Sequence, residues 1–429
     1  MRKQVLTSVL LLLALCLHSL NAQEENMVSD LDLDFYGFVR SDFFYDSYKG
    51  IDAMQDVFYL FPRFNGQDAD GEDINEQGSA NLQAIASRMG VNVTGPEIFG
   101  AKSVSNIEFD FGGIVTSEPT LFRIRKAYTS LQWENSRLLI GQNWHPFWTG
   151  SIYPTVGGFN TGAPFQPFNR SPQVKFDYQW NNLMLTGAAV YQLQYTSPAA
   201  HSTQSTSGQA KQNAVLPEFI GNIQYSGESF NIGAGISHNL TKPKMLVKDT
   251  ADNVYKADEF LASMSYLGYA QYKSSQLKIL AKSVYGQNMK HFLIPGGFGI
   301  KSYDMSSGRE NYTNYNTFSS YLNLVYGDRL QYGIYGGYIK NLGTVDELID
   351  PANSNFQENI TYGFFQNIQS IYRVAGHLAL NVNKFRFVAE YELTAASYGT
   401  GQISLTDGLY QNTHGAKNNR ILLMMMYTF

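Results

Sequence analysis

The sequence predicts an all-β fold, a transmembrane antiparallel β-barrel of about 16 strands with short periplasmic turns and long extracellular loops. Many segments alternate apolar and polar residues with a period of two, as residues 175–180 do. Tiny turns and long polar connections join these segments in strict alternation. The last segment ends the chain on an aromatic residue, Phe429. One apolar face on nearly every strand is what a barrel wall in lipid requires.

The composition fits a membrane barrel better than a helical enzyme. The chain has 429 residues, of which 44% are hydrophobic and 14% aromatic, including 29 Tyr and 28 Phe. No stretch beyond the N-terminal segment approaches the roughly 20 apolar residues that a membrane helix needs. Tyr and Phe favour strands and form the aromatic girdles of membrane barrels. The apolar content is therefore expected in strands.

The N-terminal residues resemble a secretory signal. Residues 1–22 carry two basic residues and an apolar run, and we expect cleavage after Ala22. Residues 23–32 then form a short periplasmic segment, and residues 33–429 form the barrel. Cys16 is the only cysteine and lies in the signal. The mature chain is therefore expected to lack disulfides and thiolate metal sites.

Charge and motifs exclude several classes of function. The formal net charge is −5, and removal of Arg2 and Lys3 with the signal makes it about −7, which argues against nucleic acid as a partner. No phosphate-binding loop, dinucleotide fingerprint, HExxH motif or nucleophile elbow is present. We expect no cofactor, no metal and no enzymatic activity. An outer-membrane lipase or protease is the alternative, and it needs a Ser/His/acid set that the sequence does not offer.

Sixteen segments have the strand pattern. They are residues 33–47, 86–95, 101–112, 119–132, 136–145, 171–180, 182–194, 217–227, 229–239, 258–273, 276–287, 314–327, 329–341, 369–383, 384–396 and 416–429.

The turns between these segments support the barrel over a soluble β-sandwich or propeller. Short connections such as Asn181-Asn182 and Asn383-Lys384 are rich in Asn, Gly, Asp and Ser, which suit tight hairpins. A soluble fold gives no reason for short and long connections to alternate. An even strand number places both ends of the barrel on the short-turn side, and the last strand is expected to pair with the first.

The polar face of each strand is expected to line the lumen. On the fourth strand this places Arg123, Arg125 and Thr129 inside, with Tyr128 and Lys126 on the outward face. Adjacent strands would align Arg420, Arg40, Arg88, Arg123 and Arg125 along one sector of the wall. The full set of expected pore-lining residues is Arg40, Asp42, Arg88, Glu108, Asp110, Arg123, Arg125, Arg170, Lys175, Arg373, Arg386 and Arg420.

Arginine suits an anion pathway because its charge is permanent and its planar fork matches a carboxylate or phosphate. A row of arginines would draw anions into the pore and slow cations. The alternative is structural: Glu108 or Asp110 pairs with Arg123 or Arg125 and stiffens the barrel.

The third long connection, residues 146–170, differs from an ordinary surface loop. With its flanks it reads WHPFWTGSIYPTVGGFNTGAPFQPFNRS and is rich in aromatic residues, Gly and Pro but almost uncharged. A loop in water does not need so many apolar rings. We therefore expect it to fold into the barrel as a constriction, with Arg170 projecting from it. The alternative is a cap over the outer mouth or a contact with a neighbouring subunit.

Four segments resemble the DcaP-like outer-membrane porins. They are YGFVRSDFFYD (36–46), SRMGVNVTGPEIFGAKSVSNIEFDFGG (87–113), LFRIRKAYTSLQW (121–133) and LLIGQNWHPFW (138–148). The resemblance implies a sixteen-stranded homotrimer that takes up dicarboxylates and other small organic anions. It also implies a basic constriction, here Arg40, Arg88, Arg123 and Arg125. TGAPFQPFNRSPQ (161–173) departs from the family's pattern.

Together these observations predict a porin in the outer membrane of a Gram-negative-type bacterium. We expect passive, mildly anion-preferring diffusion of small polar solutes such as organic acids, with outer-membrane lipid and two further copies as partners. The alternative is a plugged barrel that acts as a surface binding or structural protein.

Overall fold

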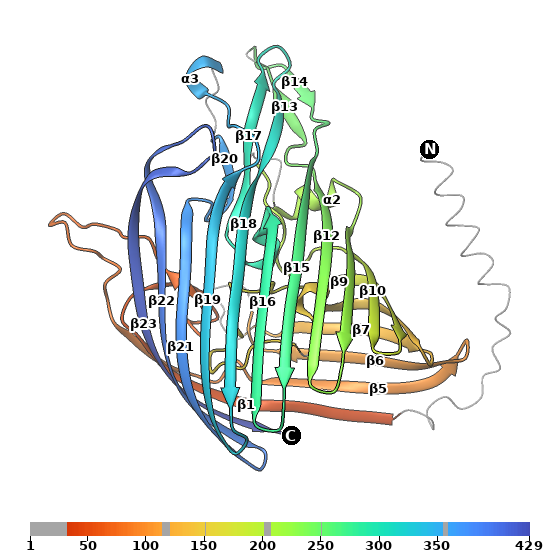
Figure 1. Cartoon of the computed structure of the whole chain (residues 1–429). Helices are drawn as coiled ribbons and strands as arrows, with labels where there is room; N and C mark the ends of the chain where they lie inside the picture. Colours follow the sequence, from red (N-terminus) through yellow and green to blue (C-terminus); the bar gives the residue numbers. More distant parts are fainter. Residues whose placement is uncertain (1–31, 114–120, 151, 201–206, 250, 355–358) are drawn as a thin grey trace.

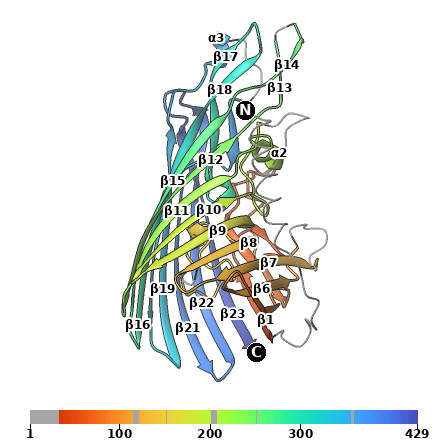
Figure 2. The ribbon, with the colours of Figure 1, turned by 90° about the vertical axis from the view of Figure 1, so that its right-hand side faces the viewer.

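The computed structural model describes residues 32–113, 121–150, 152–200, 207–249, 251–354 and 359–429. The expected signal peptide and residues 23–31 lie outside the described residues. Within them the chain forms a closed antiparallel barrel (Figures 1 and 2), as the alternating pattern predicted.

Sixteen strands of the described chain form the ring, which confirms the predicted fold class. In order around the barrel they are β1 (Asp32–Asp46), β5 (Arg88–Ile98), β6 (Ala101–Asp110), β7 (Arg123–Gln132), β8 (Ser136–Trp144), β9 (Arg170–Trp180), β10 (Leu183–Val190), β11 (Glu218–Ser226), β12 (Phe230–Thr241), β15 (Leu261–Lys273), β16 (Leu277–Gln287), β18 (Arg309–Tyr326), β19 (Leu330–Thr344), β21 (Ile368–Val382), β22 (Phe385–Ile403) and β23 (Tyr410–Thr428).

The first and last strands close the barrel. β1 pairs with β23 from Phe38 opposite Thr428 to Asp46 opposite Arg420. The backbone of Gly37 and Phe429 exchanges two hydrogen bonds, of 3.1 and 3.3 Å, so the terminal residue takes part in the closure. On its other edge β1 pairs with β5 through residues 32–38 and with β4 (Ser79–Gln83) through residues 42–46. Closure matters because backbone groups in hydrocarbon have no water to bond.

Short turns lie at one end of the barrel, as predicted. The tightest are the two-residue links between β5 and β6, between β9 and β10 and between β21 and β22. Asn181 and Asn383 adopt left-handed φ values of 51° and 53° in these links, a conformation that Asn tolerates better than most residues. The C-terminus lies at this end in Figure 1.

The opposite end carries additional elements within the long connections (Figure 1). They are β13 (Leu246–Lys248), β14 (Val254–Lys256), β17 (Gly296–Asp304), β20 (Thr361–Phe364), α2 (Ser207–Gln212) and α3 (Pro351–Ser354). β17 pairs with both β18 and β20, so one part of the wall extends beyond the ring. None of the helices within the described ranges has the length and apolarity to cross a membrane.

The two faces of the wall differ as the alternation predicted. Outward side chains on β18–β23 are apolar and exposed, among them Leu322, Ile334, Leu378 and Leu423. The lumen holds polar wall residues and a hydrophobic core. Three segments supply that core from within the barrel: a hairpin of β2 (Gly50–Ala53) and β3 (Phe58–Pro62), residues 146–169 with the 3₁₀ turn η1 (Pro146–Trp148), and the 3₁₀ turn η2 (Met289–Phe292).

Candidate functional site: a basic sector of the lumen wall

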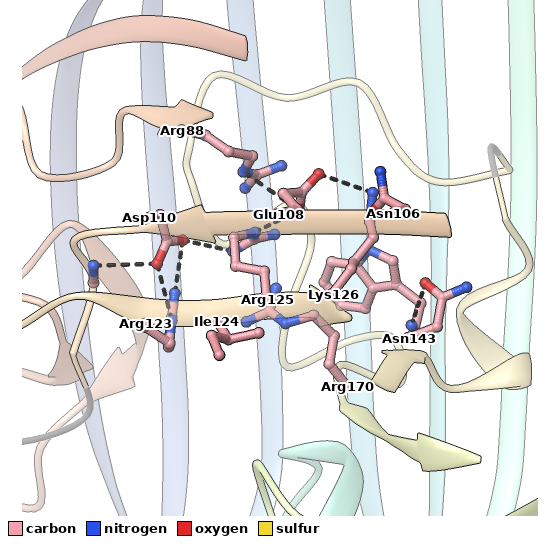
Figure 3. A network of polar contacts seen from close by, with 12 residues as sticks. Arg88, Asn106, Glu108, Asp110, Arg123, Ile124, Arg125, Lys126, Asn143 and Arg170 are labelled. Atoms are coloured by element: carbon pink, nitrogen blue, oxygen red, sulfur yellow. Dashed lines mark hydrogen bonds and ion pairs between the residues drawn. The ribbon is translucent and has the colours of Figure 1, made fainter. Parts of the chain in front are cut away.

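Three adjacent strands, β5, β6 and β7, gather charged side chains on the lumen side (Figure 3). Arg123 binds Asp110 through two hydrogen bonds of 3.0 and 2.9 Å. Arg125 bridges both carboxylates, at 2.8 Å to Glu108 and 2.7 Å to Asp110. Lys126 Nζ donates to Glu108 at 2.8 Å. The structural alternative, in which carboxylates pair with the arginines, therefore describes Arg123 and Arg125.

A β-bulge in β7 brings Lys126 into the lumen and corrects the predicted facing of this strand. Glu108 pairs with Lys126 and Phe109 with Ile124, which leaves Arg125 as the extra residue. The two residues of a bulge oppose one partner residue, so the alternation shifts by one position beyond it. The prediction that Lys126 faces outward is wrong. So is the predicted inward position of Thr129, because its hydroxyl bonds Ser105 on the outward face at 2.8 Å.

Two further arginines of this sector are less fully paired. Arg88 lies 3.8 Å from Glu108 and stacks over the Phe38 ring at 4.9 Å. Arg170 is buried, with its guanidinium 4.6 Å from the Trp144 ring centre. Its Nη1 and Nη2 have no hydrogen-bond partner among the described residues. Four cations (Arg88, Arg123, Arg125 and Lys126) thus share Glu108 and Asp110, and Arg170 nearby brings the net charge of the sector to plus three.

A cavity of about 600 Å³ opens beside this sector. Arg88, Arg125 and Lys126 form its basic side, together with Lys175. Lys175 pairs with Asp177 at 2.8 Å. The other lining residues include aromatic rings of the 146–169 segment and of the wall, among them Trp144, Trp148, Tyr153, Phe159, Phe168 and Tyr269. The cavity thus combines a basic wall with an apolar one.

The remaining predicted residues lie on the lumen side but outside this sector. Arg40 bonds Asp42 and also donates to the Gly157 carbonyl at 2.7 Å. Arg420 binds Asp46 through two bonds of 2.9 and 2.8 Å.

Two arginines of β21 and β22 bond protein groups. Arg373 is 3.1 Å from Glu392 and donates to the carbonyls of Leu60 and Ala163. Arg386 donates to Gln331 and Asn381. All three guanidinium nitrogens of Arg373 bond protein groups, whereas Nη2 of Arg386 has no hydrogen-bond partner among the described residues.

The 146–169 segment lies inside the barrel and is bonded to the wall along its length. Lys282 donates to the carbonyls of Trp148 and Ile152, each at 3.2 Å. Glu390 accepts from the backbone N–H groups of Gly157 and Gly158 at 2.6 and 2.9 Å. Asn323 accepts from Thr155 N at 2.8 Å. These bonds come from β16, β18 and β22, which lie far around the ring from the strands β8 and β9 that the segment connects.

Sequence reasoning missed a buried cluster that joins two inward segments to the wall. Glu218, at the start of β11, lies 3.2 Å from His145 Nε2 and 3.4 Å from His291 Nε2. His145 Nδ1 accepts from Phe147 N, so Nε2 carries the proton that faces Glu218. The two histidines are 146 positions apart in sequence, and only the fold brings them together. Within the described residues, no three His, Cys, Asp or Glu side chains are placed to hold a metal ion.

No family model and no curated protein sequence matches the chain. Its structure, however, is similar to several solved structures. The outer-membrane channel DcaP of Acinetobacter baumannii superposes with a TM-score of 0.65 over 95% of this chain and 100% of that one, at 18% identity. This is the fold of the outer-membrane porins.

Two more distant structures have the same architecture. The in-vitro folded OmpT of Vibrio cholerae in its trimer form gives a TM-score of 0.52 at 10% identity, covering 93% and 100% of the two chains. The anion-selective porin from Comamonas acidovorans gives 0.52 at 11% identity, with coverage of 93% and 100%. The predicted resemblance to DcaP is confirmed for the fold. At these identities the pore residues must be judged from this chain's own geometry.

Proposed function

We propose that the chain is an outer-membrane porin that gives small polar solutes a passive route across the membrane. The support is the closed barrel with an apolar outer face and a lumen that contains a charged cavity. A barrel with these two faces is stable only with hydrocarbon outside and water within. Catalysis is not part of the proposal.

We propose further that the pathway prefers anions such as small organic acids. The observation that carries this proposal is that four cations share Glu108 and Asp110 beside the cavity, with Arg170 as a fifth positive charge in the same sector. The pairing neutralises part of the sector but leaves three charges in excess. Arg88 is the residue best placed to meet a carboxylate, because it lines the cavity and its guanidinium lies 3.8 Å from Glu108. The 146–169 segment is the proposed constriction.

Reversal potentials in planar bilayers under a salt gradient test this proposal. An anion-preferring open channel gives a potential whose sign reports excess anion flux, and a panel of small organic acids and sugars then ranks solutes. A channel that prefers cations contradicts the proposed anion selectivity but not the proposed porin function. A protein that inserts into the bilayer but passes no current and swells no liposome contradicts the proposed porin function.

A plugged barrel is the second candidate, and one observation favours it. The lumen contains a hydrophobic core in which Phe61, Phe147, Phe165 and Phe292 are almost fully buried. A dry core inside a barrel reduces the cross-section available to water. Liposome swelling by small sugars separates the two candidates, because a plugged barrel admits no sugar while a narrowed porin does.

We propose a homotrimer that assembles through the wall of β6, β7 and β8. On its outward face Ser105 bonds Thr129 at 2.8 Å, and Gln142 donates to the carbonyls of Ile124 and Arg125. Polar groups are costly against lipid, whereas a protein neighbour accommodates them. Thr129→Trp is expected to dissociate the oligomer in detergent, while Ile334→Trp on the apolar outward face is not. Native mass spectrometry measures both, and a monomer in the unmodified protein removes this proposal.

A further inference from the structure

Part of the first long connection, the β2–β3 hairpin, lies in the lumen rather than in water. All five residues of β3, Phe58–Pro62, are buried, although the hairpin pairs with no strand of the ring. Phe58 packs edge-on against Phe168 of the 146–169 segment, with ring centres 4.9 Å apart. The Asn160 side chain of that segment donates to the Tyr59 carbonyl at 2.8 Å. The hairpin and the 146–169 segment therefore lie at the same level in the barrel.

The hairpin is attached to the wall by side chains that bond its carbonyl groups and by contacts of its rings, with the Tyr59 ring facing the guanidinium groups of Arg373 and Arg420. Arg373 of β21 donates to Leu60, Tyr398 of β22 donates to Pro62, and Arg420 of β23 donates to Asp56, each at 2.6 Å. Such contacts can break without disturbing the strand pairing that holds the barrel together.

The tip of the hairpin is strained. Met54, Gln55 and Asp56 are three consecutive residues with left-handed φ values of 58°, 55° and 65°. L-amino acids other than glycine adopt this conformation as single residues, at a cost of roughly 1–2 kcal/mol each. Strain of this kind persists where surrounding contacts hold it, and it is common in clamps and switch regions. The docking contacts thus hold a segment that would relax on release.

We propose that the β2–β3 hairpin is a second pore-narrowing element, a detachable one that closes part of the lumen beside the 146–169 segment. This inference rests on the proposed porin function. Because the hairpin is anchored on β21, β22 and β23, it occupies the side of the lumen opposite the wall that carries Lys175 and Tyr269. The cavity beside the basic sector is then the space that the two inward segments leave open. Release of the hairpin enlarges that space.

Removal of the hairpin tests the proposal. Gly50 and Pro62 lie opposite each other in the pairing register, so residues 51–61 can be replaced by Asn-Gly, a two-residue hairpin turn. We expect single-channel conductance to rise on the order of one half or more, because the cross-section of the lumen grows. The matched control replaces residues 247–255 by Asn-Gly, since Leu246 pairs with Lys256 in a hairpin outside the ring. The control is expected to conduct as the unmodified protein does.

The outcomes separate this inference from the proposed function. Equal conductance in the unmodified and hairpin-truncated proteins, with the heat-dependent gel shift of a folded barrel, overturns the inference and leaves the porin. A silent unmodified protein with a conducting truncation supports the inference and makes the native chain a plugged barrel. A truncation that is silent as well overturns the inference.

A milder variant covers the case in which the truncation does not fold. Tyr398→Phe removes only the hydroxyl that donates to Pro62, and we expect more frequent transitions to a larger conductance. Tyr391→Phe is its control on the same strand, because that hydroxyl bonds Asn419 on the outward face. Identical current records for the two variants overturn the inference.

Discussion

In the lumen, the guanidinium of Arg373 donates a hydrogen bond of 2.6 Å to the carbonyl oxygen of Leu60. The same guanidinium donates to Ala163 at 3.0 Å, so one wall residue holds both the β2–β3 hairpin and the 146–169 segment. The sequence predicts Arg373 to line the pore and bind the substrate. Its contacts instead favour a positioning role, in which it sets the cross-section without meeting the solute.

Arg373→Lys is expected to separate these two roles. Lysine keeps the charge but lacks the planar fork that reaches two carbonyls at once. We expect noisier and larger currents with unchanged ion selectivity, measured by single-channel recording and reversal potential. Arg309→Lys, at an exposed position, is the control. A change in ion selectivity without a change in current noise would show that Arg373 meets the solute.

The basic sector makes a quantitative prediction. Arg123→Ala with Arg125→Ala lowers the net charge of the sector from three to one. A unit charge about 10 Å away in water changes an ion's energy by about 0.4 kcal/mol, so each lost charge changes the local concentration of an ion about twofold. The reversal potential is therefore expected to move toward zero. High salt should shrink the difference between variant and parent, because screening weakens the field.

Acidity is expected to hold the hairpin closed. Burial, the neighbouring carboxylate of Asp56 and a hydrogen bond with it raise the pKa of Asp52 from 3.8 to about 7, against the lowering effect of Arg63 and Arg420. The remaining residues around this pair line a cavity of about 270 Å³: Asp46, Tyr48, Lys49, Gly50, Tyr59 and Ser79.

The docked hairpin thus binds a proton that a released hairpin loses. Docking is strongest below about pH 4 and weakens as the pH rises to about 7. Conductance is expected to be larger near pH 8 than near pH 5. Asp52→Asn should flatten this profile, while Asp68→Asn, exposed in the same connection, should leave it unchanged. A pH-dependent conductance that persists in Asp52→Asn contradicts the assignment.

The buried Glu218 predicts a loss of stability. Its carboxylate accepts from Gln192 at 3.0 Å and from Ser237, and it lies 3.2 Å from His145. Glu218→Ala leaves these donors without an acceptor, at a cost of about 1–3 kcal/mol for each buried polar group left unsatisfied. The temperature of the gel shift from folded to unfolded barrel should fall. Glu97→Ala, at an exposed position, should leave that temperature unchanged.

The wall was predictable from sequence because its rules are local. Alternation with a period of two and turn residues such as Asn181 and Asn383 each act within a few positions. The predicted facing of side chains was wrong where one extra residue shifts the alternation by one position. The bulge at Arg125 reverses the facing of Lys126 and Thr129. The alternation of apolar and polar residues does not predict such a bulge.

The interior was less predictable because it depends on contacts between distant segments. Residues 54–62 read MQDVFYLFP, which is rich in apolar and aromatic residues, as residues 146–170 are. The same argument would have placed this run inside the barrel. The pairing of Arg123 and Arg125 with Asp110 depends on strand register, which a pattern of residues leaves open.

The reversal potential of single channels under a salt gradient tests the central claim most directly. We expect open channels whose potential reports an excess of anion flux and approaches zero in Arg123→Ala with Arg125→Ala. A protein that inserts as a folded barrel yet passes neither current nor small sugars would contradict the account.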